Sequence, residues 1–205
     1  MREYLMPGTR IRVSGNIIYT ITGEPIGEGG GSIIYPALRS FPDGGGYRTG
    51  SIRYAVKECY PESGRFEFTR RETGEIRAAG DAPEAAEYLE KLKAMQREEG
   101  EISGQIYRNA FRLTPITEAY SHIEISSGDT EEYHPAANQI SVMELLSDKG
   151  ESLRTCLRDR KRLNVHEAFE VIRQVLFAVG EVHRAGFLHL DIQDGNVFIK
   201  GVLDR

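Results

Sequence analysis

The stretch IGEGGGSIIYPA, Ile26 to Ala37, places Gly27 and the run Gly29 to Gly31 between two apolar, strand-like segments. Glycine has no Cβ, so the backbone of such a turn can come close to a ligand and its N–H groups can hold phosphate oxygens. A glycine cluster between strands is more often a plain hairpin turn. The elements on either side must therefore decide between the two interpretations.

Apolar stretches with the length of strands lie on both sides of this turn, separated by glycine and proline, which favours an antiparallel meander. In the first sixty residues they are Ile11 to Val13, Ile17 to Ile21, Ile33 to Leu38 and Ile52 to Lys57. The segment FPDGGGYRTG, Phe41 to Gly50, predicts a hairpin loop within the meander. Two further strands are expected at Ile116 to Ile125 and Ile140 to Leu146.

One strand and one helix carry charged residues among apolar ones. Lys57 lies in the otherwise apolar strand YAVKE, where an inward ammonium needs a carboxylate or a phosphate; an outward edge lysine is the alternative. Apolar residues recur at helical spacing from Pro83 to Ile106 and predict a long amphipathic helix. Glu98 and Glu99 fall beside or within its apolar stripe, so one of them is expected to have a cationic partner. The polar segment 60–82 is interpreted as an insertion.

The second half of the chain changes in character. A polar, glycine-marked segment predicts a lobe boundary near Ser147 to Gly150, and Val165 to His183 predicts a core helix with one broad apolar face. The loop HLDIQDGN then places Asp191 and Asn196 five residues apart. A carboxylate can accept a hydroxyl proton and an amide oxygen can bind Mg²⁺, although Asp and Asn are also common turn formers.

These motifs, taken in this order, resemble those of the protein kinase family. The resemblance covers nearly the whole chain and implies an α+β, kinase-like fold. Residues 1–146 would be an N-lobe with a five-stranded antiparallel sheet, an αC helix and the hinge, and residues 147–205 a partial, helical C-lobe ending after the catalytic loop. The segments LMPGT and YTITGEPIGEGGGSIIYPA resemble in particular the eukaryotic-type Ser/Thr kinases of bacteria.

The resemblance implies ATP and Mg²⁺ as cofactors. Ala55 would cover the adenine, Lys57 would hold the α and β phosphates, and VMELL would be the hinge, with Met143 as gatekeeper. Phe198 would lie beneath the adenine. The residues expected to bind the nucleotide are Ile26, Gly27, Gly29, Gly30, Ile34, Ala55, Lys57, Met143, Glu144, Leu146 and Phe198.

The resemblance also assigns catalytic roles. Asp191 would orient or deprotonate a Ser/Thr hydroxyl, and Asn196 would bind the metal. Three positions depart from the family pattern. Ser32 replaces the third glycine, Leu190 replaces the catalytic-loop arginine, and Gln193 stands where a lysine usually contacts the γ-phosphate.

Two neighbouring residues of the helix are candidates for the partner of Lys57. Glu98 is preferred, because Ile102 then fills the apolar position that the family usually has four residues further on. Glu99 would put Ser103 there, yet it lies nearer the centre of the apolar stripe.

The leading interpretation is an ATP-dependent Ser/Thr protein kinase. A pseudokinase or nucleotide-binding scaffold is the alternative, and a small-molecule kinase of the aminoglycoside or choline type is a third. The sequence stops at Arg205 before any DFG motif, so we expect a fragment that is inactive by itself, with the missing C-lobe needed to complete the fold. Phe169 and Leu176 of the core helix would then be partly exposed.

Composition limits the other classes of function. The 26 Lys and Arg against 31 Asp and Glu give a formal charge of −5, which argues against a nucleic-acid partner. The sequence has no apolar run of about 18 residues and no signal-like start, so we expect a cytoplasmic protein without membrane contact. Cys59 and Cys156 lie far apart without metal-ligand spacing and are expected to be buried thiols. The protein substrate is not identified.

Overall fold

The computed structural model describes residues 2–14, 17–43, 46–109, 117–127, 130, 132–145, 151–160 and 162–199. The chain divides into two compact units. The first consists of Met1–Ile102 and Thr117–Leu145, and the second of Ser103–Ile116 and Leu146–Arg205. The expected lobe boundary at 147–150 and the hinge residue Leu146 lie outside the described residues.

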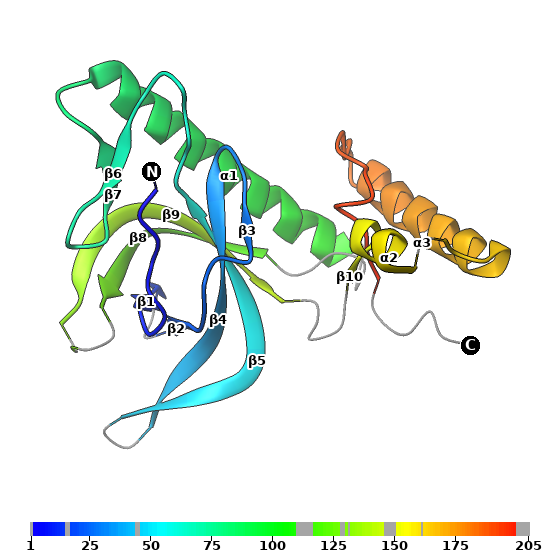
Figure 1. The fold of residues 1–205 in the computed structure, drawn as a ribbon, viewed down its shortest axis with the longest axis horizontal. Coiled ribbons are helices and arrows are strands. Elements are labelled where there is room, and N and C mark those ends of the chain that lie inside the picture. The colour runs from blue at the N-terminus through cyan, green and yellow to red at the C-terminus, as the bar shows by residue number, and fades with distance from the viewer. Residues whose placement is uncertain are drawn as a thin grey trace. The chain divides into compact units, whose positions relative to one another are not determined.

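An antiparallel sheet with the strand order β2-β1-β8-β9-β5-β4-β3 forms the first unit. Its strands are β1 (Arg10–Arg12), β2 (Ile18–Ile21), β3 (Gly27–Glu28), β4 (Ser32–Asp43), β5 (Gly46–Cys59), β8 (Thr117–Ser126) and β9 (His134–Glu144). Because β2 pairs with β4 as well as with β1, all strands except β3 form a closed ring of pairings (Figure 1). Closure leaves few unpaired strand edges.

Strand alternation explains the core of this sheet. The register places Tyr35 opposite Val56, and Val56 opposite Val142, so three buried side chains form one row across β4, β5 and β9. Successive residues of a strand point to opposite faces, so the neighbouring row, which contains Lys57, lies on the other face of the sheet. The largest fully buried apolar side chains of the first unit are Ile11, Ile18, Tyr19, Ile21, Ile33, Tyr35, Tyr60, Ile76, Ile123 and Ile140.

The predicted meander is confirmed, but the expected five strands are too few. β1 pairs with β2, β2 with β4, and β4 with β5, all antiparallel. The six strand-like stretches of the sequence each overlap one strand of the sheet, and the very short strand at Gly27–Glu28 makes the seventh. The expected loop at Phe41 to Gly50 is also shorter than predicted, since β4 extends to Asp43 and β5 begins at Gly46.

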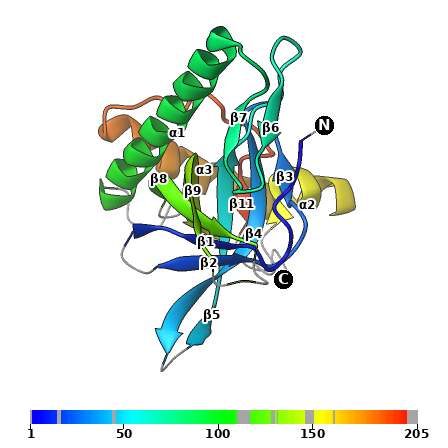
Figure 2. The ribbon, with the colours of Figure 1, turned by 90° about the vertical axis from the view of Figure 1, so that its left-hand side faces the viewer.

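The long helix α1 (Pro83–Asn109) confirms the periodicity prediction. Figure 2 shows α1 lying across β8 and β9. The contact is close at Gly100, where an added Cβ would come within 2.6 Å of the Ala119 Cβ. Gln96 fixes the same face of the helix by donating to the backbone oxygen of Lys57 at 2.9 Å and to Ser141 Oγ at 3.3 Å.

The segment 60–82 packs within the first unit, and its interpretation as an insertion stays a prediction. It forms the hairpin of β6 (Phe68–Arg70) and β7 (Ile76–Ala78), and both Phe68 and Ile76 are buried in the core. Arg70 donates to both carboxylate oxygens of Glu58, at 2.9 and 2.6 Å, and the Glu58 side chain is fully buried. Asn138 adds a 3.0 Å hydrogen bond to Glu58. A buried charge needs such a set of partners.

The second unit contains β10 (Glu151–Ser152), α2 (Leu153–Arg160), α3 (Val165–Arg184) and β11 (Phe198–Ile199), with β10 and β11 paired antiparallel. Asn164 begins α3 with a capping box completed by Glu167. The predicted helix is therefore confirmed. Its apolar face is exposed as expected, since Phe169 and Leu176 are each 66% accessible.

Two smaller expectations concern the thiols and membrane spans. Cys59 and Cys156 are free and buried, as predicted, and desolvation raises the pKa of Cys59 to about 12. No helix within the described ranges is long and apolar enough to cross a bilayer.

Candidate functional site

The glycine-rich segment forms the hairpin between β3 and β4. Gly27 lies opposite Ile34, and the N–H of Ile26 donates to the Ile34 oxygen at 2.8 Å. At the tip, the N–H of Gly29 donates to the Ser32 oxygen at 3.0 Å. Three of the proposed nucleotide-binding positions, Ile26, Gly27 and Ile34, therefore belong to one paired element.

Nothing in the described chain requires glycine at the hairpin tip. Gly29, Gly30 and Gly31 have no positive φ, and a Cβ added to any of them would meet no atom within 4 Å. The N–H groups of Gly30 and Gly31 also have no acceptor among the described residues. The tip thus has open space and free donors, which suits the close approach of an anionic group.

The hairpin is held from outside by Arg2, which the sequence analysis missed. The Arg2 side chain is only 9% exposed. Its guanidinium donates to the backbone oxygens of Gly29, Ser32 and Tyr60 at 2.9, 3.3 and 3.0 Å, and to Glu62 Oε2 at 2.9 Å. The N–H of Glu62 in turn donates to the Gly30 oxygen at 2.8 Å. One arginine near the start of a sequence gives no signal of these contacts.

Lys57 lies in β5, directly opposite Ile34 of β4, so it shares a row with the glycine hairpin. Its Nζ is 2.8 Å from both carboxylate oxygens of Glu99. The preference for Glu98 as the partner of Lys57 is therefore wrong. Lys57 is an inward lysine with a carboxylate partner, the first of the two possibilities that the sequence left open.

The rotation of α1 about its axis explains why Glu99, rather than Glu98, pairs with Lys57. Gln96 contacts β5 and β9, and residues three apart on a helix share a face, so Glu99 follows Gln96 towards Lys57. Gly100 continues this face against Ala119. Glu98 is one position out of phase and is exposed.

Three of the expected adenine-binding positions, Ala55, Met143 and Glu144, lie on the same sheet. Ala55 is buried and pairs with Met143 of β9, and Glu144 pairs with Tyr54. Ala55 and Lys57 are two residues apart on β5, so they share the face that carries Ile34. The glycine hairpin, Lys57 and Met143 thus belong to neighbouring strands of one unit.

The loop of Asp191 is ordered by amide side chains in the second unit. Asn196 Nδ2 donates to Asp191 Oδ2 at 2.7 Å and to the Asp191 backbone oxygen at 3.0 Å. Gln193 Nε2 donates to Asp191 Oδ1 at 2.9 Å. The structure therefore brings all three predicted residues together and leaves the amide oxygen of Asn196 without a partner among the described residues.

Arg154 of α2 holds this loop and was also missed from the sequence. It donates from Nε to Asp194 Oδ1 at 2.9 Å and from a terminal nitrogen to Gln193 Oε1 at 3.1 Å. The hydrogen bond from Arg154 lowers the pKa of Asp194. Gly195 packs against the guanidinium, since an added Cβ would lie 3.1 Å from Arg154 Cζ.

Leu190 has a left-handed backbone with φ of 56°, although it is 88% exposed. A non-glycine residue in this region costs on the order of 1 kcal/mol, and such residues collect at functional loops. Next to it, the N–H of Asp191 donates to His189 Nδ1 at 3.3 Å. Phe198 lies in β11 opposite Ser152 and is 56% exposed.

Each unit by itself carries groups of a chemical type that can bind one part of a magnesium nucleotide. Asp191 and Asn196 offer the carboxylate and amide oxygens that Mg²⁺ prefers, while the glycine tip offers unpaired N–H groups. Within the described part of the chain no three His, Cys, Asp or Glu side chains gather as a metal site. A metal bound by Asp191 and Asn196 would therefore need further oxygen ligands from the nucleotide or from water.

Comparison with known proteins gives short matches to protein kinases. A 58-residue stretch is 41% identical to the hormonally up-regulated neu tumor-associated kinase homolog of Xenopus tropicalis, covering 28% of this chain and 8% of that protein. A 59-residue stretch is 42% identical to the probable serine/threonine-protein kinase zyg-1 of Caenorhabditis elegans, covering 29% of this chain and 8% of that protein. No family model matches the chain. These partial similarities suggest a kinase of the Ser/Thr class, and the specific resemblance to bacterial kinases stays a prediction.

Proposed function

We propose that this chain carries the nucleotide-binding and catalytic-loop segments of an ATP-dependent Ser/Thr protein kinase. The observation that carries the proposal is the contact of Lys57 Nζ with both oxygens of Glu99, in register with the glycine hairpin. A lysine oriented by a carboxylate beside free backbone donors is suited to the phosphates of a nucleotide. The short matches to Ser/Thr kinases agree with it.

In this proposal the residues have distinct roles. The N–H groups of Gly30 and Gly31 and the Lys57 ammonium bind phosphate oxygens, while Ala55 and Met143 contact the base. Bound Mg²⁺ would neutralise phosphate charge, with Asn196 as a protein ligand. Asp191 accepts the proton of the attacking hydroxyl, and the amides of Gln193 and Asn196 orient its carboxylate.

Titration with a fluorescent ATP analogue and Mg²⁺ tests the nucleotide site. The 205-residue chain is expected to bind saturably, and Lys57→Met to weaken binding about tenfold or more, through loss of a charge-assisted contact. Lys91→Met is the matched control, because Lys91 is an exposed lysine of α1. Absence of saturable binding, or equal losses in both variants, would overturn the proposal.

A nucleotide-binding pseudokinase is the second candidate. Gln193 favours it, because a neutral amide stabilises charge on a transferring phosphoryl group less well than an ammonium does. The Gln193 side chain is also engaged at both ends, by Asp191 and by Arg154. Binding of the analogue without phosphate transfer, in a form of the protein extended to include a DFG segment, would favour this candidate.

A further inference from the structure

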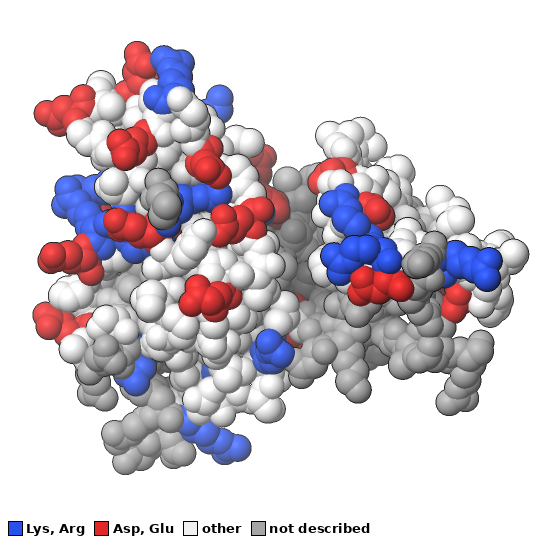
Figure 3. All heavy atoms as spheres, viewed as in Figure 1, with Lys and Arg blue, Asp and Glu red and all other residues white. Residues whose placement is uncertain are grey.

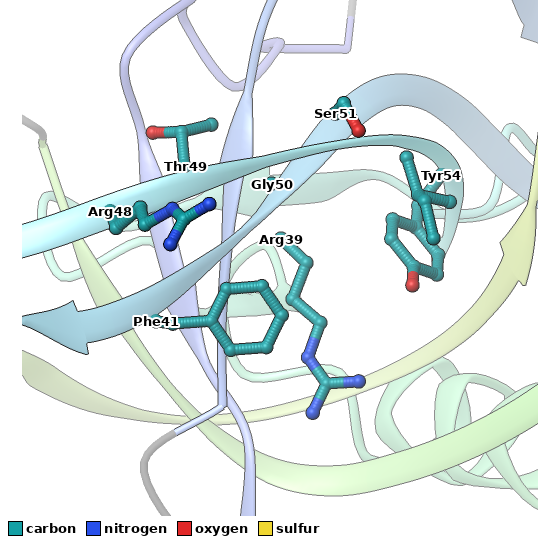
Figure 4. A pocket seen from close by; sticks show the side chains of 8 residues that line it. Arg39, Phe41, Arg48, Thr49, Gly50, Ser51 and Tyr54 are labelled. Atoms are coloured by element: carbon teal, nitrogen blue, oxygen red, sulfur yellow. The ribbon is translucent and has the colours of Figure 1, made fainter.

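The hairpin of β4 and β5 extends beyond the ring of strands and carries a pocket of its own. Both views show this hairpin projecting from the sheet (Figures 1 and 2). The pocket measures about 590 Å³ and is lined in part by Arg39, Phe41, Arg48, Ile52 and Tyr54 (Figure 4). None of these residues belongs to the proposed nucleotide site.

The pocket is rich in donors and has no carboxylate among its described lining residues. Arg39 lies over the Phe41 ring, 5.0 Å from its centroid, and its Nε is buried without a hydrogen-bond partner. Arg48 lies opposite Phe41 in the β4–β5 register, is exposed, and has no partner among the described residues. Thr49 and Ser51 add hydroxyl groups. A buried unpaired N–H is costly, so the Arg39 Nε indicates a missing acceptor.

The same part of β5 presents an unpaired backbone edge. β5 pairs with β9 only over Tyr54–Glu58, and the backbone contact of Leu145 with the Arg53 oxygen ends this pairing. Over residues 48–52 no described strand lies on the side of β5 opposite β4. An extended peptide can add to such an edge, with its side chains reaching pockets beside the strand.

We propose that the β4–β5 hairpin binds an extended, phosphorylated peptide segment of another protein, because two arginines without a carboxylate in the pocket lining match the double charge of a phosphate. The anion would contact Arg39 and Arg48, and the exposed Phe41 and Ile52 would pack against an apolar neighbour in the peptide. Arginine suits this anion, because its planar guanidinium can make paired hydrogen bonds.

A peptide fits the observations better than a nucleic acid does. The formal charge of the chain is −5. Over α1 and the β6–β7 hairpin, basic and acidic side chains are mixed rather than gathered in a basic stripe (Figure 3).

Fluorescence anisotropy with labelled nonapeptides tests this inference without nucleotide, so its result is independent of the proposed kinase function. The probe carries one phosphoserine between valines, and matched peptides carry glutamate or serine at that position. The phosphoserine peptide is expected to bind about tenfold more tightly than the serine peptide. The glutamate peptide is expected to bind more weakly than the phosphoserine peptide, and equal affinity for the two would overturn the assignment of a phosphorylated ligand.

Arg48→Gln is the informative variant, because Arg48 is exposed and its loss should leave the fold intact. It should weaken binding of the phosphoserine peptide about tenfold. Arg173→Gln, which removes the same charge from the exposed face of α3, should change it less than about twofold. N-methylation of alternate peptide amides should also abolish binding, because it blocks pairing with the β5 edge.

Several results would overturn the inference. They are equal affinity for the serine and phosphoserine peptides, equal losses in Arg48→Gln and Arg173→Gln, or unchanged affinity of the N-methylated peptide. Tighter, Arg48-dependent binding of poly-U RNA or phosphatidylserine vesicles would assign the pocket to a different class of partner.

Discussion

Lys57 Nζ lies 2.8 Å from both carboxylate oxygens of Glu99, the residue that follows Glu98 on α1. The two side chains of the pair are 23% and 61% exposed. A pair with this exposure contributes about 0–1 kcal/mol to stability. The main effect of the ion pair is therefore to fix the position of the Lys57 ammonium.

Glu99→Gln is predicted to impair nucleotide binding with little effect on folding. Loss of the carboxylate leaves the Lys57 ammonium unrestrained beside the glycine hairpin, so affinity for an ATP analogue with Mg²⁺ should fall about three- to tenfold. Urea unfolding should change by less than about 1 kcal/mol. Glu98→Gln is the matched control and should bind as the wild type does. Equal losses in the two variants would contradict the assigned pairing.

Arg2→Gln is predicted to loosen the glycine hairpin. Arg2 donates to two backbone oxygens at the tip and to Glu62, so its loss frees the segment around Gly29 to Ser32. Hydrogen exchange of the amide of Glu62, which donates to the Gly30 oxygen, should accelerate. Arg12→Gln breaks an ion pair with Glu124 on other strands and serves as control. Unchanged exchange at Glu62 would show that Arg2 does not hold the hairpin.

The long strands of the main sheet and the helices α1 and α3 were predictable because local patterns determine them, whereas β6, β7, α2 and the rotation of α1 were not. Periodicity defines an apolar stripe but cannot choose between adjacent residues at its border. The close approach of Gly100 to Ala119 sets the rotation and brings Glu99 to Lys57. That contact depends on a strand that follows the helix in the sequence.

Contacts between charged residues that lie far apart in the sequence could not be predicted either. Arg2 reaches residues 27 to 60 positions away, and Arg154 reaches a loop about 40 residues further on. Neither arginine belongs to a pattern that could have singled it out. The spacing of Asp191 and Asn196, by contrast, is local, and the structure places these two side chains within hydrogen-bond distance.

Arg70→Met is predicted to destabilise the first unit strongly. It removes the ion-pair partner of the fully buried Glu58, and loss of one member of a buried pair costs about 3–5 kcal/mol. Urea unfolding followed by circular dichroism measures the change. The neighbouring Arg71 is exposed, so Arg71→Met should stay within about 0.5 kcal/mol of wild type. A small effect of Arg70→Met would show that water reaches Glu58.

The contacts of Arg70 also bear on whether it could bind a phosphate. Arg70 is occupied by Glu58, by the Gly74 oxygen and by the Glu3 oxygen. Arg65 pairs with Glu84.

Arg154→Met is predicted to raise the pKa of Asp194. In the folded chain the hydrogen bond from Arg154 holds this pKa below its usual value. A depressed carboxylate pKa stabilises the fold above the unfolded pKa, and the stabilisation is lost as the pH falls through the folded value. In the wild type, this part of the stability therefore declines only below about pH 4. In the variant, the pH dependence due to Asp194 should be weaker, because only the backbone hydrogen bonds of the loop would still lower its pKa.

Carbon-detected NMR titration of the carboxyl groups measures this shift directly. Glu170 is an internal control, because its pKa is lowered to about 2 by hydrogen bonds from Arg173 and Gln174, far from Arg154 in the sequence. Arg154→Met should raise the pKa of Asp194 and leave that of Glu170 unchanged. The hydrogen bond from Arg154 to Gln193 is lost in the same variant, so the amide of Gln193 should also exchange conformers more freely beside Asp191. An unchanged Asp194 pKa would mean that backbone N–H groups of the loop, rather than Arg154, hold its carboxylate.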